Sequence, residues 1–254
     1  MRMSWRVTTS LAAVVLATVP VLTITNGFPD GVQHPYVGIA VQNVPGGEII
    51  CSGADLSPTK MLTAAHCFDP DPANPVWVVY LSEPPFTGWL PGTFHPDPAW
   101  CATCGSGLQG SDRHDVGVIT HVASNLGSFA ALPPVGFVDT LPNRTPVDLV
   151  GYGVQGFTRG GGPPNGIFTA IRFVAPSLLM QTNKLASPEF ITLTANPAQG
   201  KGGTCFGDSG GPDLLGGTDI VLAVDTFVTN RNCTGVTYSN RVDLSDIQTF
   251  INKF

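Results

Sequence analysis

Glycine and proline make up about a fifth of this chain, with 30 Gly and 23 Pro among 254 residues. Both residues interrupt helices and mark turns, so this density excludes a helical bundle or a coiled coil. It is typical of many short strands joined by turns. Hydrophobic residues make up 43% of the chain, which is enough to form a core and excludes extensive disorder. We therefore expect an all-β protein.

Short apolar runs between turn clusters continue along the chain after Ile24. This regular spacing of strands predicts a barrel or a sandwich. The candidate strands span residues 36–41, 48–51, 76–81, 116–119, 147–150, 167–174, 191–194 and 220–224.

A terminal helix is predicted where Leu244, Ile247 and Ile251 recur at helical spacing. Phe250 and Phe254 widen the apolar stripe. Asp243 or Ser245 is expected to cap its first turn.

The charge pattern excludes one class of function. Only 12% of the residues are charged, the formal net charge is −6, and no run of Lys or Arg occurs. A protein that binds nucleic acid through a basic face needs such a run or patch, so we expect no nucleic-acid partner.

The N-terminus predicts export. Arg2 and Arg6 precede an apolar run from Leu11 to Leu22 that Pro20 interrupts. A membrane-spanning helix needs about 20 apolar residues, so the run indicates a secretory signal, with Ala17 a candidate small residue for cleavage. An N-terminal anchor or a buried strand is the alternative. We expect a secreted, extracellular protein with no stable membrane association.

Six cysteines are expected to pair in an oxidising compartment. Six cysteines allow fifteen connectivities, and sequence order suggests three local pairs. These pairs are Cys51–Cys67, Cys101–Cys104 and Cys205–Cys233.

The Cys101–Cys104 segment has two alternative interpretations. A thioredoxin-type site needs a helix after the first cysteine, and the glycine-rich residues 105–110 do not favour one. With His95 and His114 a zinc site is conceivable, but the spacing fits no common ligand pattern. We therefore favour a small disulfide loop and predict no metal site.

The segment Gly207-Asp-Ser-Gly-Gly-Pro212 is the strongest chemical signal. Glycines around Ser209 leave its hydroxyl exposed and let a substrate carbonyl approach the backbone amides. An ordinary glycine-rich turn is the alternative. The segment also fits the nucleophile elbow of α/β-hydrolases, but those enzymes have their histidine after the serine. All five histidines of this chain precede Ser209, which excludes that fold.

A histidine and an aspartate precede the serine in favourable contexts. His66 lies among small residues beside Cys67, and Asp115 opens a buried apolar strand. A carboxylate there needs a partner for its charge, and a histidine N–H is a natural one. Separately, His66 could be a surface imidazole and Asp115 a turn residue.

Taken in order, these segments resemble the trypsin-like (chymotrypsin-fold) serine proteases. Thr63-Ala-Ala-His66-Cys67, His114-Asp115-Val116 and Gly207–Pro212 match the three catalytic motifs of that family, and Gly151-Tyr-Gly153 is similar to its Gly-Trp-Gly turn. The resemblance covers the chain after residue 23.

The resemblance implies two six-stranded antiparallel Greek-key barrels and a C-terminal helix. It divides the chain into a signal peptide with a candidate short pro-segment (1–23), an N-terminal barrel (24–125) and a C-terminal barrel with the helix (126–254).

The roles of the site residues follow from the resemblance. Ser209 would attack the scissile carbonyl, His66 would take and return the proton, and Asp115 would orient His66. The backbone amides of Gly207 and Ser209 would form the oxyanion hole. Cys51–Cys67 would clamp the histidine loop, and Cys205–Cys233 would tie the serine loop to the pocket wall.

The resemblance also implies an activation step and a substrate pocket. A freed amino group at Ile24 would pair with Asp208. Gly203 would lie at the pocket base, and Thr226-Phe227-Val228 stands where the family often has Ser-Trp-Gly. Because Gly203 carries no charge, poor cleavage after Arg or Lys is expected, with Val228 favouring small or medium apolar side chains.

We therefore predict a secreted, monomeric serine endopeptidase without a cofactor, which acts on protein or peptide substrates. A protein inhibitor is a further candidate partner. The alternatives are a catalytically silent, protein-binding member of the same fold and an esterase on that fold.

Overall fold

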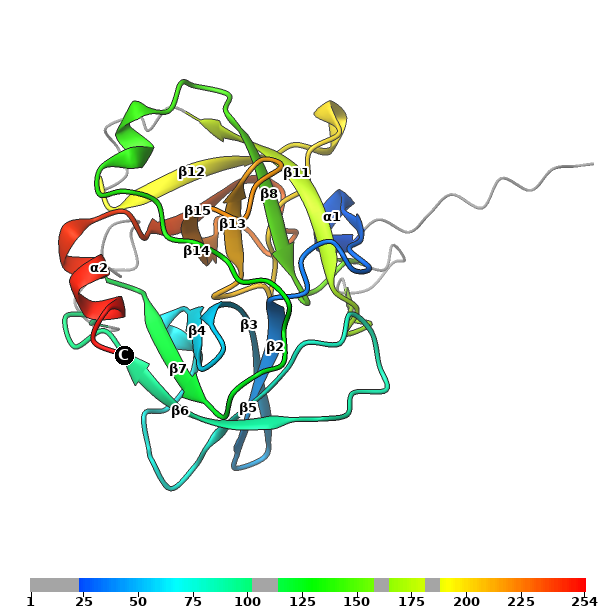
Figure 1. The fold of residues 1–254 in the computed structure, drawn as a ribbon. Helices are drawn as coiled ribbons and strands as arrows, with labels where there is room; N and C mark the ends of the chain where they lie inside the picture. Colours follow the sequence, from blue (N-terminus) through cyan, green and yellow to red (C-terminus); the bar gives the residue numbers. More distant parts are fainter. Residues whose placement is uncertain (1–22, 102–113, 158–164, 181–187) are drawn as a thin grey trace, which may run out of the picture.

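The computed structural model describes residues 23–101, 114–157, 165–180 and 188–254 of the chain. Two β-barrels lie one against the other, with strands β2–β7 in one and strands β8 and β11–β15 in the other (Figure 1). The predicted signal sequence falls almost wholly outside the described residues. No helix in the described ranges is long and apolar enough to cross a bilayer.

The first barrel closes from six antiparallel strands in the order β2-β3-β4-β7-β6-β5. Its hairpin of β2 and β3 turns at Pro45-Gly46, and β5 returns to pair with β2. The strands are β2 (Val37–Val44), β3 (Gly47–Ser57), β4 (Lys60–Thr63), β5 (Val76–Val79), β6 (Leu90–Pro96) and β7 (Gly117–His121).

The second barrel closes in the same way. Its strands run β11-β12-β15-β14-β13-β8, and pairing of β8 with β11 completes the ring, while β1 (Phe28–Pro29) adds to β11 from outside. The strands are β8 (Pro146–Gly151), β11 (Phe173–Met180), β12 (Phe190–Ala195), β13 (Pro212–Leu215), β14 (Val221–Val228) and β15 (Gly235–Arg241). The predicted architecture of two six-stranded antiparallel barrels is confirmed.

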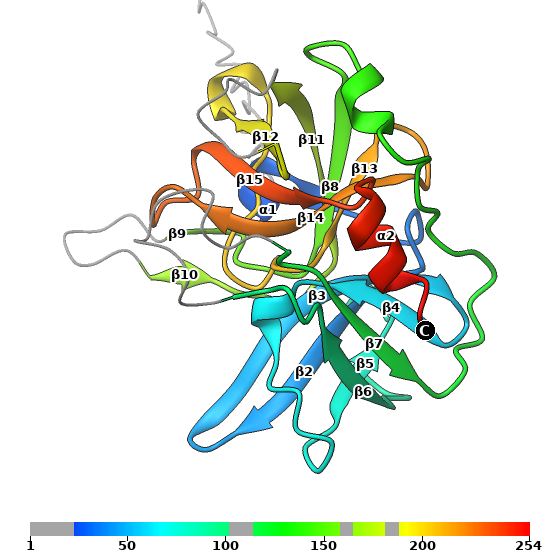
Figure 2. The ribbon, with the colours of Figure 1, turned by 90° about the vertical axis from the view of Figure 1, so that its left-hand side faces the viewer.

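The remaining elements are short. A small ribbon pairs β9 (Gly156–Phe157) with β10 (Gly166–Ile167). The short helical segments are α1 (Thr23–Asn26), η1 (Ala65–Cys67), η2 (Phe137–Thr140) and η3 (Pro197–Gln199), and α2 (Ser245–Ile251) ends the fold. Figure 2 shows α2 beside β7 and near β14 and β15.

The terminal helix has the predicted apolar face, because Ile247, Phe250 and Ile251 are buried. The predicted cap is wrong. The N-cap residue is Leu244, which offers no capping side chain. The Asp243 carboxylate instead binds the Arg241 guanidinium at 2.8 and 2.9 Å and the backbone N–H of Val138 at 2.8 Å. Pairing with a buried cation outweighs helix capping here.

Several strands differ from the sequence prediction. The strand expected over 167–174 begins only at Phe173, and β4, β6, β13 and β15 were not predicted. β15 reads Gly-Val-Thr-Tyr-Ser-Asn-Arg, in which polar side chains occupy buried positions. Its partners across the barrel determine its conformation, and the apolar pattern alone does not reveal it.

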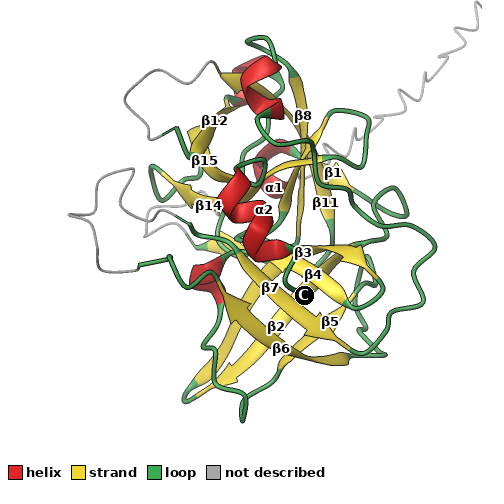
Figure 3. Ribbon diagram, turned by 60° about the vertical axis from the view of Figure 1, so that its left-hand side comes forward, coloured by secondary structure: helices red, strands yellow, loops and turns green. Residues whose placement is uncertain are grey.

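One core cluster joins the two barrels. It combines Val37 and Leu62 of the first barrel with Val150 and Val224 of the second, and Ile247 of α2 packs into it. Figure 3 shows α2 close to strands of both barrels. This shared core holds together the loops that meet between the barrels.

A buried arginine strengthens the junction. Arg172, 1% exposed, binds the Asp30 carboxylate at 2.7 Å and donates to the carbonyls of Val37 and Tyr80 in the first barrel and to Gly31. Because the guanidinium has five donors in a fixed fork, it satisfies several acceptors at once.

Candidate active site

Strand pairing in the first barrel brings His66 and Asp115 together. β4 ends at Thr63, β7 begins at Gly117, and these two residues are directly paired. η1 with His66 follows β4, and Asp115 lies two residues before the start of β7. Since β4 and β7 are antiparallel, the chain leaving β4 and the chain entering β7 meet at the same end of the barrel.

Asp115 holds the histidine by two hydrogen bonds. Its Oδ2 lies 2.7 Å from His66 Nδ1, and its Oδ1 accepts from the backbone N–H of His66 at 2.9 Å. Asp115 is 1% exposed, whereas the His66 side chain is 35% exposed. This arrangement directs Nδ1 to the carboxylate and fixes the orientation of the ring.

The turn that carries Ser209 is packed against the histidine loop. A Cβ on Gly210 would collide with Thr63 Oγ1 and come within 2.6 Å of the Ala64 amide nitrogen, so only glycine fits. Gly210 also has φ +78°. The backbone N–H of Ser52 donates to the Ser209 carbonyl at 2.9 Å. The glycine after the serine is therefore what allows the close approach of the two loops.

Two backbone amides of the serine turn differ from the others in their hydrogen bonding. Asp208, Gly210 and Gly211 donate their N–H groups to protein carbonyls. The amides of Gly207 and Ser209 have no protein acceptor in the part of the chain that the structure describes. Gly207 has φ +94°, a conformation that favours glycine. These are the two amides that the family resemblance predicts for an oxyanion hole.

Ser209 and His66 line one pocket of about 260 Å³ between the serine turn and β14. Phe227 on the β14 side is fixed by stacking on Tyr238 at 5.0 Å and by edge contact with Phe190 at 5.6 Å. The lining residues are His66, Thr204, Cys205, Phe206, Ser209, Asp225, Thr226, Phe227 and Val228.

Of the residues expected in the pocket, Thr226, Phe227 and Val228 lie in its lining, and Gly203 does not. Gly203 is buried, its amide donates to Thr25, and a Cβ at this position would collide with that of Ala195. Thr25 and Gly203 form an isolated antiparallel β-bridge, which occupies the backbone N–H of Gly203.

Asp208 lies fully buried beneath the serine turn. Its carboxylate accepts from the Gly153 amide at 2.7 Å and from the Cys205 amide at 2.8 Å. Burial raises the pKa of Asp208 to about 7, and these two hydrogen bonds only partly oppose the shift. A cation would stabilise the charged carboxylate.

The Ile24 segment packs on the second barrel near this turn. Ile24 is 1% exposed in the core of that barrel. Thr25 Oγ1 bonds the carbonyls of Gly203 and Cys233 at 3.1 and 3.0 Å. Ile24 has φ +35°, which is strained for a β-branched residue.

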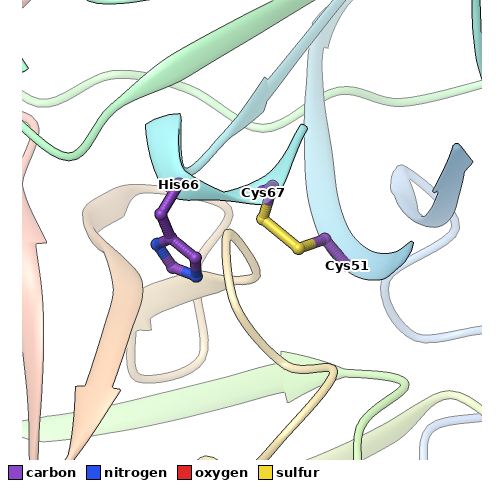
Figure 4. A group of neighbouring side chains, drawn as sticks. All are labelled: Cys51, His66 and Cys67. Carbon is purple, nitrogen blue, oxygen red and sulfur yellow. A yellow bond between two sulfur atoms is a disulfide. The ribbon is translucent and has the colours of Figure 1, made fainter. Parts of the chain in front are cut away.

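Two of the predicted disulfides are present in the described residues. Cys51 pairs with Cys67 and Cys205 with Cys233. Figure 4 shows the His66 ring beside the Cys51–Cys67 bond. These three residues have the donor types of a metal site, but both sulfurs are bonded to each other and provide no thiolate. The predicted Cys101–Cys104 pair lies outside the description, because Cys104 falls in 102–113.

Three residues at the site were not found from the sequence. Asn240 of β15, fully buried, accepts from the Asp115 amide at 3.2 Å. Phe206, 54% exposed, forms part of the pocket wall. Asp225 also lines the pocket. Of these three residues, only Phe206 could have been identified from the sequence, because it directly precedes the serine motif Gly207–Pro212.

Comparison with known proteins places this geometry in a family. A family model described as Trypsin matches residues 29–251. No curated protein matches. Among solved structures, an HL collagenase has 17% identity and a TM-score of 0.69, covering 90% of this chain and 97% of its own. Human heparin binding protein has 18% identity and a TM-score of 0.66, covering 91% and 96%. At these identities the structures establish the fold, and the family match over most of the chain shows that this protein belongs to the trypsin family.

Proposed function

We propose that this protein is a serine endopeptidase that cleaves peptide bonds through an acyl-enzyme. The observation that carries the proposal is the pair of hydrogen bonds between His66 and the Asp115 carboxylate, in a site where His66 and Ser209 line one pocket. A protein that only binds a partner does not need this arrangement.

The chemistry follows from the positions of the groups. Ser209 Oγ attacks the scissile carbonyl while His66 takes its proton, and Asp115 stabilises the imidazolium that forms. The amides of Gly207 and Ser209 receive the developing oxyanion, and one such donor is worth about 3 kcal/mol of barrier. His66 then protonates the leaving amine, and water releases the acyl group. No cofactor takes part in this scheme.

We also propose export and N-terminal processing. The basic and apolar N-terminus and the disulfides support secretion to an extracellular, oxidising compartment. Cleavage before Ile24 would free an amino group at a segment that already bridges Gly203 through Thr25. Such a cation would balance the negative charge of the buried Asp208 carboxylate. It would thereby stabilise the turn that holds the oxyanion amides.

Labelling with a fluorescent organophosphonate tests the proposed activity. The wild-type protein should be labelled stoichiometrically at Ser209 and should hydrolyse casein, whereas Ser209→Ala should do neither. Labelling with ester hydrolysis but no peptide hydrolysis would favour the esterase alternative. A folded wild-type protein that is not labelled would favour the silent, protein-binding alternative.

A further inference from the structure

The backbone of Asp115 is held from the second barrel. Asp115 lies outside the ladder of β7, which begins at Gly117, and it follows His114, whose φ of +58° is uncommon for a residue with a side chain. The fully buried Asn240 of β15 accepts from the Asp115 N–H at 3.2 Å. Because β7 and β15 belong to different barrels (Figure 1), this hydrogen bond crosses the junction between them.

The Asn240 side chain is fixed in the orientation that this bond needs. Its Nδ2 donates to the Arg241 carbonyl at 3.1 Å, which directs Oδ1 to Asp115. The Arg241 guanidinium is in turn bound to the Asp243 carboxylate at 2.8 and 2.9 Å. An amide carries both a donor and an acceptor, so this one side chain satisfies two backbone groups. An apolar side chain in its place would leave both without this partner.

A β-bulge connects Asn240 to the wall of the substrate pocket. The register of β14 against β15 shifts between Asp225 and Phe227, which makes Thr226 the extra residue. Bulges redirect side chains, and here Thr226 Oγ1 accepts from the backbone N–H of Asn240 at 3.2 Å. Thr226 also lines the pocket that contains the serine. The pocket wall and the Asp115 backbone are therefore joined through one residue.

Three hydrogen bonds thus define the position of Asp115. Two join its carboxylate to the ring and the backbone of His66, within the first barrel. The third joins its amide to Asn240 of the second barrel, whose β12 and β13 flank the Ser209 turn. A misplacement of about 1 Å between reacting groups can lower a rate by about 100-fold. The bond that crosses the barrels therefore bears on the rate of proton transfer between Ser209 and His66.

We propose that Asn240 is a positioning residue for catalysis, which holds the Asp115–His66 pair in place relative to Ser209, and that the Thr226 bulge in turn fixes Asn240. This inference rests on the proposed peptidase function. It adds to that function a buried residue outside the pocket lining.

Replacing the Asn240 amide by side chains of similar shape separates positioning from packing. Asn240→Leu removes the acceptor, so kcat should fall by about 10- to 100-fold while KM changes less than about threefold. Asn240→Asp retains an oxygen at the acceptor position and should keep kcat within about fivefold of wild type. Steady-state kinetics with a peptide substrate measure both constants.

Ser177→Ala is the matched control. The buried Ser177 hydroxyl donates to the Thr194 carbonyl at 2.8 Å inside the second barrel, and neither residue lines the pocket. The variant loses a buried hydrogen bond without touching Asp115, so it should lose stability and keep kcat. An equal loss of kcat in Ser177→Ala and Asn240→Leu would assign the effect to stability and overturn the proposal.

A measurement on an inactive protein separates this inference from the proposed activity. The pKa of His66, followed by nuclear magnetic resonance in Ser209→Ala, requires no catalysis. Adding Asn240→Leu should lower this pKa by about 0.5 or more, because a carboxylate that is less firmly held stabilises the imidazolium less. Adding Ser177→Ala should leave it unchanged. Failure of organophosphonate labelling therefore bears only on the proposed activity.

Several outcomes would overturn the proposal. They are a folded Asn240→Leu protein with kcat near wild type, an unchanged pKa of His66 in that variant, and an Asn240→Asp protein as impaired as Asn240→Leu. If Asn240→Leu does not fold, Thr226→Val tests the same connection, because it removes the oxygen that accepts the Asn240 N–H. Both kcat and the pKa of His66 should then fall, and wild-type values would contradict the proposal.

Discussion

The Asp115 carboxylate is hydrogen-bonded to His66 at two points. Its Oδ2 lies 2.7 Å from the ring Nδ1 of His66, and its Oδ1 accepts from the backbone N–H of His66 at 2.9 Å. The second bond fixes the main chain of the residue whose ring the first bond orients. Both rotation of the ring and movement of η1 are therefore restrained by one buried side chain.

Asp115→Asn is expected to lower kcat by about 10⁴, because an amide cannot stabilise the imidazolium and favours the wrong tautomer. KM should change little. Steady-state kinetics with a peptide substrate measure both constants. Asp97→Asn is the control, since Asp97 is also a buried carboxylate next to a histidine, His114, at 3.3 Å. An equal loss in both variants would show that the effect comes from destabilisation.

Ser209→Ala should lower kcat by about 10⁶ and leave folding intact, because it removes the nucleophile and the rest of the turn can remain as it is. Casein hydrolysis and thermal unfolding report the two effects. Ser124→Ala, which removes a buried hydroxyl bonded to Asp55, should retain activity. A Ser209→Ala protein with a rate near wild type would refute the proposed nucleophile.

The mature protein should begin at Ile24. N-terminal sequencing of the active, secreted form tests this directly. Asp208→Asn should lower kcat/KM by about 10²–10³, the loss typical of a damaged oxyanion hole, because the buried amide cannot pair with a freed amino group. A fully active form that retains residues 18–23 would contradict the model of activation.

Stability should fall as pH rises from about 4 to about 7. Burial raises the pKa of Asp213 to about 7 in the folded protein, so the folded state binds a proton that the unfolded state has already released. The stabilisation is present below the unfolded pKa and is lost as pH approaches the folded value. Asp213→Asn should reduce this dependence and raise the free energy of unfolding at pH 8 by about 2–4 kcal/mol. Urea unfolding at two pH values measures the change. If the dependence of the free energy of unfolding on pH were unchanged in Asp213→Asn but altered in Asp71→Asn, at an exposed loop position, its assignment to Asp213 would be contradicted.

Arg172→Met should lower the free energy of unfolding by about 3–5 kcal/mol, because it leaves the Asp30 carboxylate buried without its cation. Arg231→Met, at an exposed position, should change the free energy of unfolding little. Chemical denaturation compares the two variants. Similar stability of both would show that Arg172 does not secure the junction between the barrels.

The sequence by itself determined the features that depend on residues close together along the chain. Turn-forming glycines and prolines with short apolar runs indicated strands, and the apolar spacing of Ile247 and Ile251 located the terminal helix. The glycine after Ser209 and the small residues before His66 marked the two loops, because each loop needs those residue types to take its own conformation.

Only the tertiary structure determined which residues from distant strands pack around these loops. Asn240 reaches the Asp115 amide from 125 residues away, and the register of β14 with β15 sets Asp225 opposite Ser239. Gly203 could be aligned by counting from Ser209, yet in the structure it bridges Thr25, lies close to Ala195 and is absent from the pocket lining. A barrel interior is filled from all of its strands, so the charge of the pocket depends on strand register and closure, which no local pattern in the chain encodes.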